Sequence, residues 1–327
     1  MSATYNNPFF APEFTGEIIP ISLEDPILNI FADGKFDLNC PGSATILKLF
    51  AHIQLEALHL THTILLSTPT FLPISENNTT TTTAHFPEPH PSPSHLTPQE
   101  THRTLYYLSL ILPQIDVIVS PTTGSASGMT FLQPHRPLPI LPGCGSTIAI
   151  NPQKITKLTT AFQTSNEIAQ QILMFDLAIL LTHELAHALV FAVLPRNSPS
   201  SSSNSSGSLG NAFLGTATAD EIGFEFERRL WGGLISMDVG AIYGTQWWNH
   251  YEYALTLREW PNPHILDSYA ASEDLLTIHT REEMARVGCV WRVSFEYVNR
   301  MFRDEFWRGV VGGGGGMLCM QGGRRGF

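Results

Sequence analysis

The longest apolar stretch of the chain, residues 168–194, is interrupted by glutamines, an aspartate, a glutamate and two histidines. These polar residues would be costly in a bilayer, so the stretch is typical of a buried core helix rather than a membrane span. Thr164 with Glu167 matches a capping-box start, and Pro195 supplies a stop. The pattern therefore predicts a core helix of about thirty residues.

The remaining hydrophobic patterns are shorter. Helical spacing over residues 43–66 predicts one amphipathic helix within an N-terminal extension, residues 1–75. Further helices are predicted at residues 99–112, 219–231, 273–287 and 293–307. Short strands between Pro and Gly turns are predicted at residues 117–119, 129–132 and 147–150. We therefore expect an α+β fold, in which a small twisted mixed sheet packs on the long helix and the C-terminal half is helical.

Three segments have a strongly biased composition. Residues 76–98 combine a run of five threonines with repeated prolines, which predicts a disordered linker. Residues 198–208 are rich in serine and are expected to be a mobile surface insert. The glycine-rich residues 312–327 are expected to be a flexible tail. The span between linker and tail, residues 99–311, is then the main domain.

Composition and charge exclude several classes of partner. The chain has 29 acidic residues against 18 Lys and Arg, a net charge of −11, which disfavours nucleic acid and anionic membrane surfaces as partners. Only 14% of the residues are charged, so the surface must depend on uncharged polar residues. No secretory signal pattern is visible, so a cytoplasmic or nuclear location is expected. The 4 cysteines form no CxxC pair, and a cysteine zinc site is therefore not indicated.

The motif His-Glu-x-x-His occupies residues 183–187 of the predicted core helix. His183 and His187 are four residues apart, so they project from one helix face and can bind the same cation. The carboxylate of Glu184 lies beside that face and can act as general base toward a metal-bound water. Because these groups are costly to bury without partners, the motif predicts a zinc site with Glu184 as its catalytic residue.

A catalytic zinc site needs a third protein ligand and leaves a fourth position to water. Glu221 and Glu225 lie four residues apart at the start of the next predicted helix, so both are candidates. Structural roles are the alternatives. Glu221 can form a capping box with Thr218, and Glu225 or Glu227 can pair with the arginines that follow.

Residues 182–188, taken together with residues 220–225, resemble the gluzincins, the thermolysin-like group of zinc metallopeptidases. The resemblance implies a zincin-like arrangement, with the sheet packed on the metal-binding helix. The chain departs from the family pattern in the second segment, where Gly223 loosens the helix. The Asn, Ser and Asp that the family usually has there are replaced by Asp220, Phe224 and Glu225.

The resemblance also implies a role for each residue of the motif. His183, His187 and Glu221 would bind Zn²⁺, Glu184 would be the general base, and Glu225 would support a ligand histidine. The activity implied is hydrolysis of peptide bonds in a peptide or protein substrate. By the same resemblance, residues 147–150 are expected to be the edge strand along which the substrate lies. The donor that stabilises the oxyanion is not assigned; the candidates are Tyr243, His250, Tyr251, Tyr253 and His264.

Two other functions fit the same residues. One is a zinc-binding structural or regulatory module without proteolytic activity, and the other is a metallohydrolase that acts on a non-peptide substrate. A further metal site is conceivable on the predicted N-terminal helix, which carries His52, His59 and His62. No carboxylate completes that site, so these histidines are expected to face solvent or to cap.

Overall fold

The computed structural model describes residues 21–23, 38–76, 79–124, 126–195, 212–217, 219–237, 255–260, 290–312 and 318 of the chain. These residues form an α+β fold with small sheets around a long helix, which confirms the predicted fold class.

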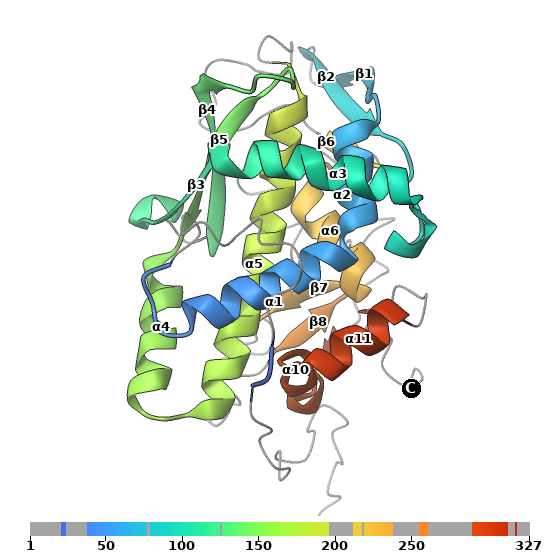
Figure 1. The fold of residues 1–327 in the computed structure, drawn as a ribbon. Coiled ribbons are helices and arrows are strands. Elements are labelled where there is room, and N and C mark those ends of the chain that lie inside the picture. Colours follow the sequence, from blue (N-terminus) through green and yellow to red (C-terminus); the bar gives the residue numbers. More distant parts are fainter. Residues whose placement is uncertain are drawn as a thin grey trace, which may run out of the picture.

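The long helix α5 (Glu167–Val193) runs down the middle of the molecule (Figure 1). It forms the centre of the core, because its contacts include four helices and two strands: α1 (Ser43–Glu56), α2 (Leu58–Leu66), α4 (Pro152–Gln163), α6 (Ile222–Trp231), β4 (Gly128–Pro137) and β5 (Cys144–Ile150). The predicted helix is confirmed, but its start is different. Asn166 caps the helix by accepting a hydrogen bond from the Ala169 amide, whereas Thr164 ends the preceding helix, α4 (Pro152–Gln163).

Helix α5 is long and apolar enough to cross a membrane by length and composition alone. However, 89% of its most apolar window is buried inside the protein. Burial of this extent is typical of the core helix of a soluble protein.

The N-terminal helical region is part of the same core. It forms two helices, α1 (Ser43–Glu56) and α2 (Leu58–Leu66), which meet at Ala57 in place of the single helix predicted. Both pack on α5, and their apolar residues join one hydrophobic cluster with those of α5 and α6. The main body therefore buries the apolar face of these helices, while residues 1–20 and 24–37 of the predicted extension lie outside the described residues.

The Thr/Pro-rich segment 76–98 is not the disordered linker that we predicted. The threonine run opens β2 (Thr79–Phe86), which pairs with β1 (Thr70–Glu76) and with β6 (Ala212–Leu214). Threonine is β-branched and favours strands, and Thr83, Ala84 and Phe86 are buried. The chain then reaches α3 (Pro98–Ile111), which begins with a capping box.

The predicted mixed sheet is confirmed, with the strand order β3-β5-β4. The strand β5 (Cys144–Ile150) pairs in parallel with β3 (Ile115–Val119) and antiparallel with β4 (Gly128–Pro137). Because β5 is central and fully buried, the prediction that residues 147–150 form an edge strand is wrong. Two strands of this sheet, β5 and β4, contact α5. Of these two, β4 has an open edge among the described residues.

The described part of the C-terminal half contains short strands as well as helices. The helix α6 (Ile222–Trp231) is followed by an antiparallel sheet of β7 (Leu234–Ser236), β8 (Thr256–Arg258) and β9 (Val290–Arg292). Two helices, α10 (Phe295–Met301) and α11 (Asp304–Gly312), replace the single one predicted near the end.

Part of the predicted flexible tail packs on the body, since the Tyr297 hydroxyl donates a hydrogen bond to the Leu318 carbonyl. The serine-rich insert, the predicted helix at residues 273–287 and all five candidate oxyanion donors lie outside the described residues.

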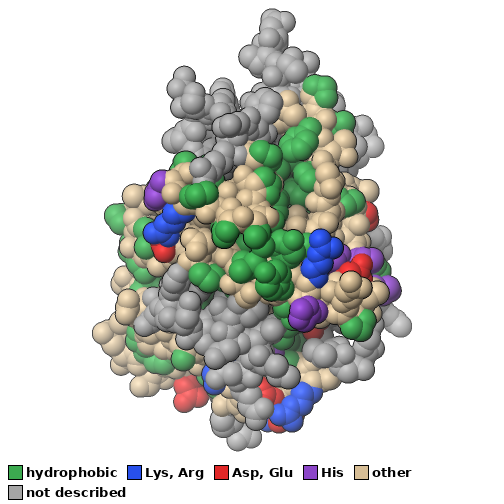
Figure 2. All heavy atoms as spheres, turned by 45° about the horizontal axis from the view of Figure 1, so that its top comes forward, with side chains coloured by type: hydrophobic (Ala, Val, Ile, Leu, Met, Phe, Trp, Pro, Cys, Tyr) green, Lys and Arg blue, Asp and Glu red, His purple; other side chains and the backbone are tan. Residues whose placement is uncertain are grey.

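One face of the molecule can be compared with the polarity expected of the surface. Figure 2 shows a face on which hydrophobic and uncharged polar atoms predominate, while charged side chains are few and scattered. This distribution agrees with the content of 14% charged residues.

Candidate metal centre

The two motif histidines on α5 meet a carboxylate from the start of α6. The Glu221 Oε1 atom lies 2.7 Å from the Nε2 atom of His187 and 3.4 Å from that of His183. One ligand atom from each residue lies within 4.8 Å of the other two, so the group could hold a metal ion. The His187 side chain is 26% exposed and that of His183 is 10% exposed, so the centre opens to solvent on the His187 side.

Glu221 caps its helix and also faces the two histidines, so the capping role and the ligand role that the sequence left as alternatives are compatible. It is the N-cap of α6, and its Oε2 atom accepts a hydrogen bond of 2.6 Å from the Phe224 amide. The other oxygen, Oε1, faces the histidines. One carboxylate oxygen is therefore fixed by the helix, and the other is held at the centre. Thr218, the capping partner considered from the sequence, lies outside the described residues.

The carboxylate that supports His183 is Glu227, and the prediction of Glu225 for this role is wrong. Glu227 Oε1 lies 2.9 Å from His183 Nδ1, and its Oε2 accepts a hydrogen bond from the Ile235 amide at 3.0 Å. A carboxylate on Nδ1 favours the tautomer with its proton there, which leaves Nε2 as a lone-pair donor toward the centre.

Glu225 has a structural role, as one of our alternatives stated. It is buried, and its carboxylate accepts hydrogen bonds of 2.6 to 2.9 Å from Arg228 and Arg229. Arg229 also donates a hydrogen bond to Glu88, in the connection between β2 and α3, and thereby ties α6 to that connection. The charge of Glu225 is therefore compensated within α6 and is not directed at the histidines.

Gly223 allows the close approach of α6 to α5. A Cβ atom at this position would lie 2.5 Å from three atoms of the His183 ring, which is closer than any real contact. The next residue, Phe224, packs edge-on against the same ring, with the centroids 4.9 Å apart. The sequence suggested that Gly223 loosens the helix, but its main effect is to leave space for the histidine.

The carboxylate of Glu184 is held in place by β4. The Thr130 hydroxyl lies 2.7 Å from Glu184 Oε2 and 3.0 Å from the Glu184 backbone carbonyl. On the same strand, a Cβ atom at Gly128 would lie 2.9 Å from Glu184 Oε1. Two residues of this strand therefore position Glu184, and it is largely buried beside the histidines.

The electrostatics of the centre favour a positive charge. Burial opposes a charge on His183, but Glu221, Glu227 and Glu184 together raise its pKa well above its ordinary value. Burial likewise opposes a charge on Glu221, whose pKa the two histidines nevertheless lower well below its usual range. Three carboxylates around one buried ring make a cation the natural occupant.

Two residues that contribute to the centre, Glu227 and Thr130, were not predicted from the sequence. Glu227 was considered from the sequence only as a partner for the arginines that follow it. Thr130 lies in a different segment from the motif, and nothing in its surroundings marks it. Its role depends on a strand that packs beside α5.

Comparison with known proteins gives no further guide to this centre. No family model matches the chain, and it matches neither a curated protein nor a solved structure.

Proposed function

We propose that this protein is a zinc-dependent metallopeptidase of the gluzincin type. The observation that carries the proposal is the convergence of His183, His187 and Glu221 beside Glu184, which a strand holds in place. A set of two histidines and one glutamate is the donor set of thermolysin-type zinc sites, and it leaves a coordination position for water or substrate.

The donors fit zinc by their chemistry as well as by their number. Imidazole nitrogens suit zinc and related transition metals, while Mg²⁺ and Ca²⁺ prefer oxygen alone. The Nδ1 atom of His183 is already engaged by Glu227, which presents its Nε2 atom to the centre. Such a hydrogen bond to a ligand histidine raises the basicity of the ring and fixes its orientation.

When bound, zinc would polarise the scissile carbonyl and lower the pKa of a water molecule. The protein residues have separate tasks. Glu184 accepts a proton from the attacking water and returns it to the leaving amine. The Thr130 hydroxyl donates to Glu184 Oε2, which fixes one oxygen and leaves Oε1 for the proton transfer. Glu227 keeps His183 in the tautomer that binds metal.

A peptide is the substrate class that the surroundings favour. The strand β4 runs beside α5, carries the residues that hold Glu184, and has an open edge among the described residues. An extended peptide can pair with such an edge through main-chain hydrogen bonds. Its scissile bond would then pass close to Glu184.

The test is Glu184→Gln, compared with the exposed control Glu305→Gln. Glutamine keeps the size of the side chain and can still accept the Thr130 hydrogen bond, but it cannot take up the proton. We expect unchanged zinc content in both variants, and a fall of about 10² or more in peptide-library cleavage for Glu184→Gln only. Zinc binding by wild-type protein that cleaves no peptide would instead favour the structural module or a non-peptide substrate.

A further inference from the structure

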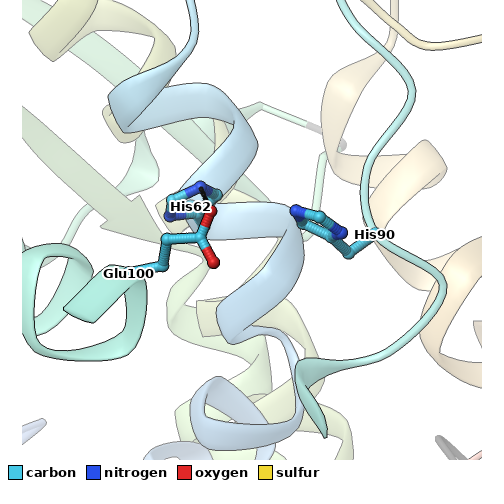
Figure 3. A group of neighbouring side chains, drawn as sticks. All are labelled: His62, His90 and Glu100. Atoms are coloured by element: carbon cyan, nitrogen blue, oxygen red, sulfur yellow. Dashed lines mark ion pairs between the residues drawn. The ribbon is translucent and has the colours of Figure 1, made fainter. Parts of the chain in front are cut away.

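A second group of metal-binding side chains lies outside the centre described above. It consists of His62 on α2, His90 in the connection between β2 and α3, and Glu100 in the first turn of α3 (Figure 3). One ligand atom from each lies within 4.8 Å of the others. We propose that these three residues form a second metal site, which binds a divalent transition metal such as Zn²⁺ and fixes the β2–α3 connection.

This group differs from the three-histidine site considered from the sequence. His52 stacks on Trp307, with ring centroids 5.0 Å apart, and His59 is buried in the core rather than facing solvent. Only His62 takes part in the second group. The missing carboxylate is Glu100, which a different helix supplies.

The hydrogen bonds around His62 show which ring nitrogen can bind a metal. The Thr104 hydroxyl donates its hydrogen to the Glu100 carbonyl at 2.8 Å. The same hydroxyl oxygen lies 2.9 Å from His62 Nδ1, and it must therefore accept a hydrogen bond from that nitrogen. A proton on Nδ1 leaves the lone pair on Nε2.

The Nε2 atom of His62 faces Glu100 Oε1 at 3.9 Å, which is too long for a hydrogen bond. In the neutral ring, the lone pair of Nε2 is directed toward a carboxylate oxygen, so two acceptors face one another. A cation between them satisfies both, and His90 lies across the gap, with its ring centroid 6.1 Å from that of His62.

Glu100 is positioned as a metal ligand would be. The capping box of α3 holds its Oε2 atom, which accepts from the Thr97 amide and from the Thr97 hydroxyl, each at 2.8 Å. Only Oε1 is then directed at the histidines. The first centre is arranged in the same way. One oxygen of Glu221 accepts a hydrogen bond from a backbone amide at the start of its helix, and the other oxygen faces two histidines.

A metal at this site would connect the β2–α3 segment to two helices. The side chain of His90 is exposed, and a metal would tie its ring to α2 and α3. Two residues before His90, Glu88 pairs with Arg229 on α6, the helix that also supplies Glu221. Binding at His62, His90 and Glu100 would therefore restrict a segment that also braces α6. The mixed nitrogen and oxygen donors select zinc-like metals over Mg²⁺ and Ca²⁺.

The experiment counts zinc ions in full-length protein that has been stripped with chelator, reloaded with Zn²⁺ and dialysed. The variants are His90→Ala, which removes an exposed ring, and Glu100→Gln, which keeps the capping box but removes the charge. The matched control is His135→Ala, an exposed histidine on β4. Amide exchange of residues 87–97 is measured with and without Zn²⁺.

We expect His90→Ala and Glu100→Gln to bind one zinc ion fewer than wild type, while His135→Ala binds the wild-type number. Zinc should slow exchange across residues 87–97 in wild type and in the control only. The comparison is independent of the first centre: if that centre binds no zinc, the count falls from one to zero instead of from two to one. Equal counts in wild type, His90→Ala and Glu100→Gln would overturn the proposal.

Discussion

Glu227 and Glu225 lie on the same short helix, but their replacement by alanine should have different effects. Glu227→Ala should weaken metal binding, whereas Glu225→Ala should lower the stability of the fold. Glu227→Ala removes the acceptor for His183 Nδ1 and for the Ile235 amide. The His183 ring then loses both its orientation and its fixed tautomer. Loss of such a partner typically weakens metal binding by about 10- to 100-fold, or about 1.4 to 2.7 kcal/mol.

Glu225→Ala should act on stability instead. It leaves Arg228 and Arg229 without the buried carboxylate that they share. Removal of one partner of a buried ion pair costs about 3 to 5 kcal/mol, although Arg229 keeps Glu88 and the Arg228 side chain is 36% exposed, so we expect the lower end. The zinc affinity of the folded fraction should stay within about threefold of wild type, well below the 10-fold loss typical of a lost ligand partner.

Two measurements separate these effects. Zinc affinity is measured by competition with a chromogenic chelator at a temperature at which both variants are folded, and stability is measured by urea unfolding of the zinc-free protein. The reasoning would be refuted if Glu225→Ala weakened zinc binding more than Glu227→Ala did under these conditions.

Three further predictions concern single residues. Gly223→Ala should weaken zinc binding by at least about 10-fold, because the new Cβ atom would lie 2.5 Å from the His183 ring. The control is Gly309→Ala, whose new Cβ atom would meet no atom of the described residues within 4 Å and which should stabilise its helix by up to about 1 kcal/mol. Glu221→Ala should abolish zinc binding at the first centre, and loss of the N-cap should lower the free energy of unfolding by about 1 kcal/mol; a variant that keeps this zinc ion would remove Glu221 from the ligand set. Burial raises the pKa of Glu56 from 4.5 to about 7, so its contribution to stability is present below pH 4.5 and is lost as the pH rises through 7. Glu56→Gln should therefore raise the free energy of unfolding by up to about 3 kcal/mol at pH 8 and change it little at pH 4.5; an equal effect at both pH values in urea unfolding would contradict this reasoning.

The parts of the fold that could be predicted are those encoded in local patterns. The helix α5 has a long apolar run, and the strands β3, β4 and β5 lie between Pro and Gly turns, so both features were found from the sequence. The order of those strands depends on pairing between distant segments, and local periodicity does not report it. Composition misled us for the threonine run, because strand pairing and a few buried side chains outweighed its polarity.

The error at Glu225 has a specific geometric origin. The prediction placed Glu221 in the first turn of a helix, so that a residue four positions later would share its face. Glu221 is instead the N-cap, with an extended backbone at φ −87° and ψ 90°, and the helix begins at Ile222. Because the backbone of Glu221 is not helical, its side chain does not follow the face on which Glu225 lies. The carboxylate that reaches His183 is therefore Glu227.

The departures from the gluzincin pattern become intelligible once this start of the helix is known. Gly223 stands where the ring of His183 lies against the backbone, and no larger residue fits there. Phe224 closes the side of that ring by an edge contact and also donates its amide to Glu221. The support for His183 then comes from Glu227, while Glu225 neutralises the two arginines. The three residues of the proposed donor set therefore meet although the second helix departs from the family pattern, because the positions of the donor atoms matter and the order of residues does not.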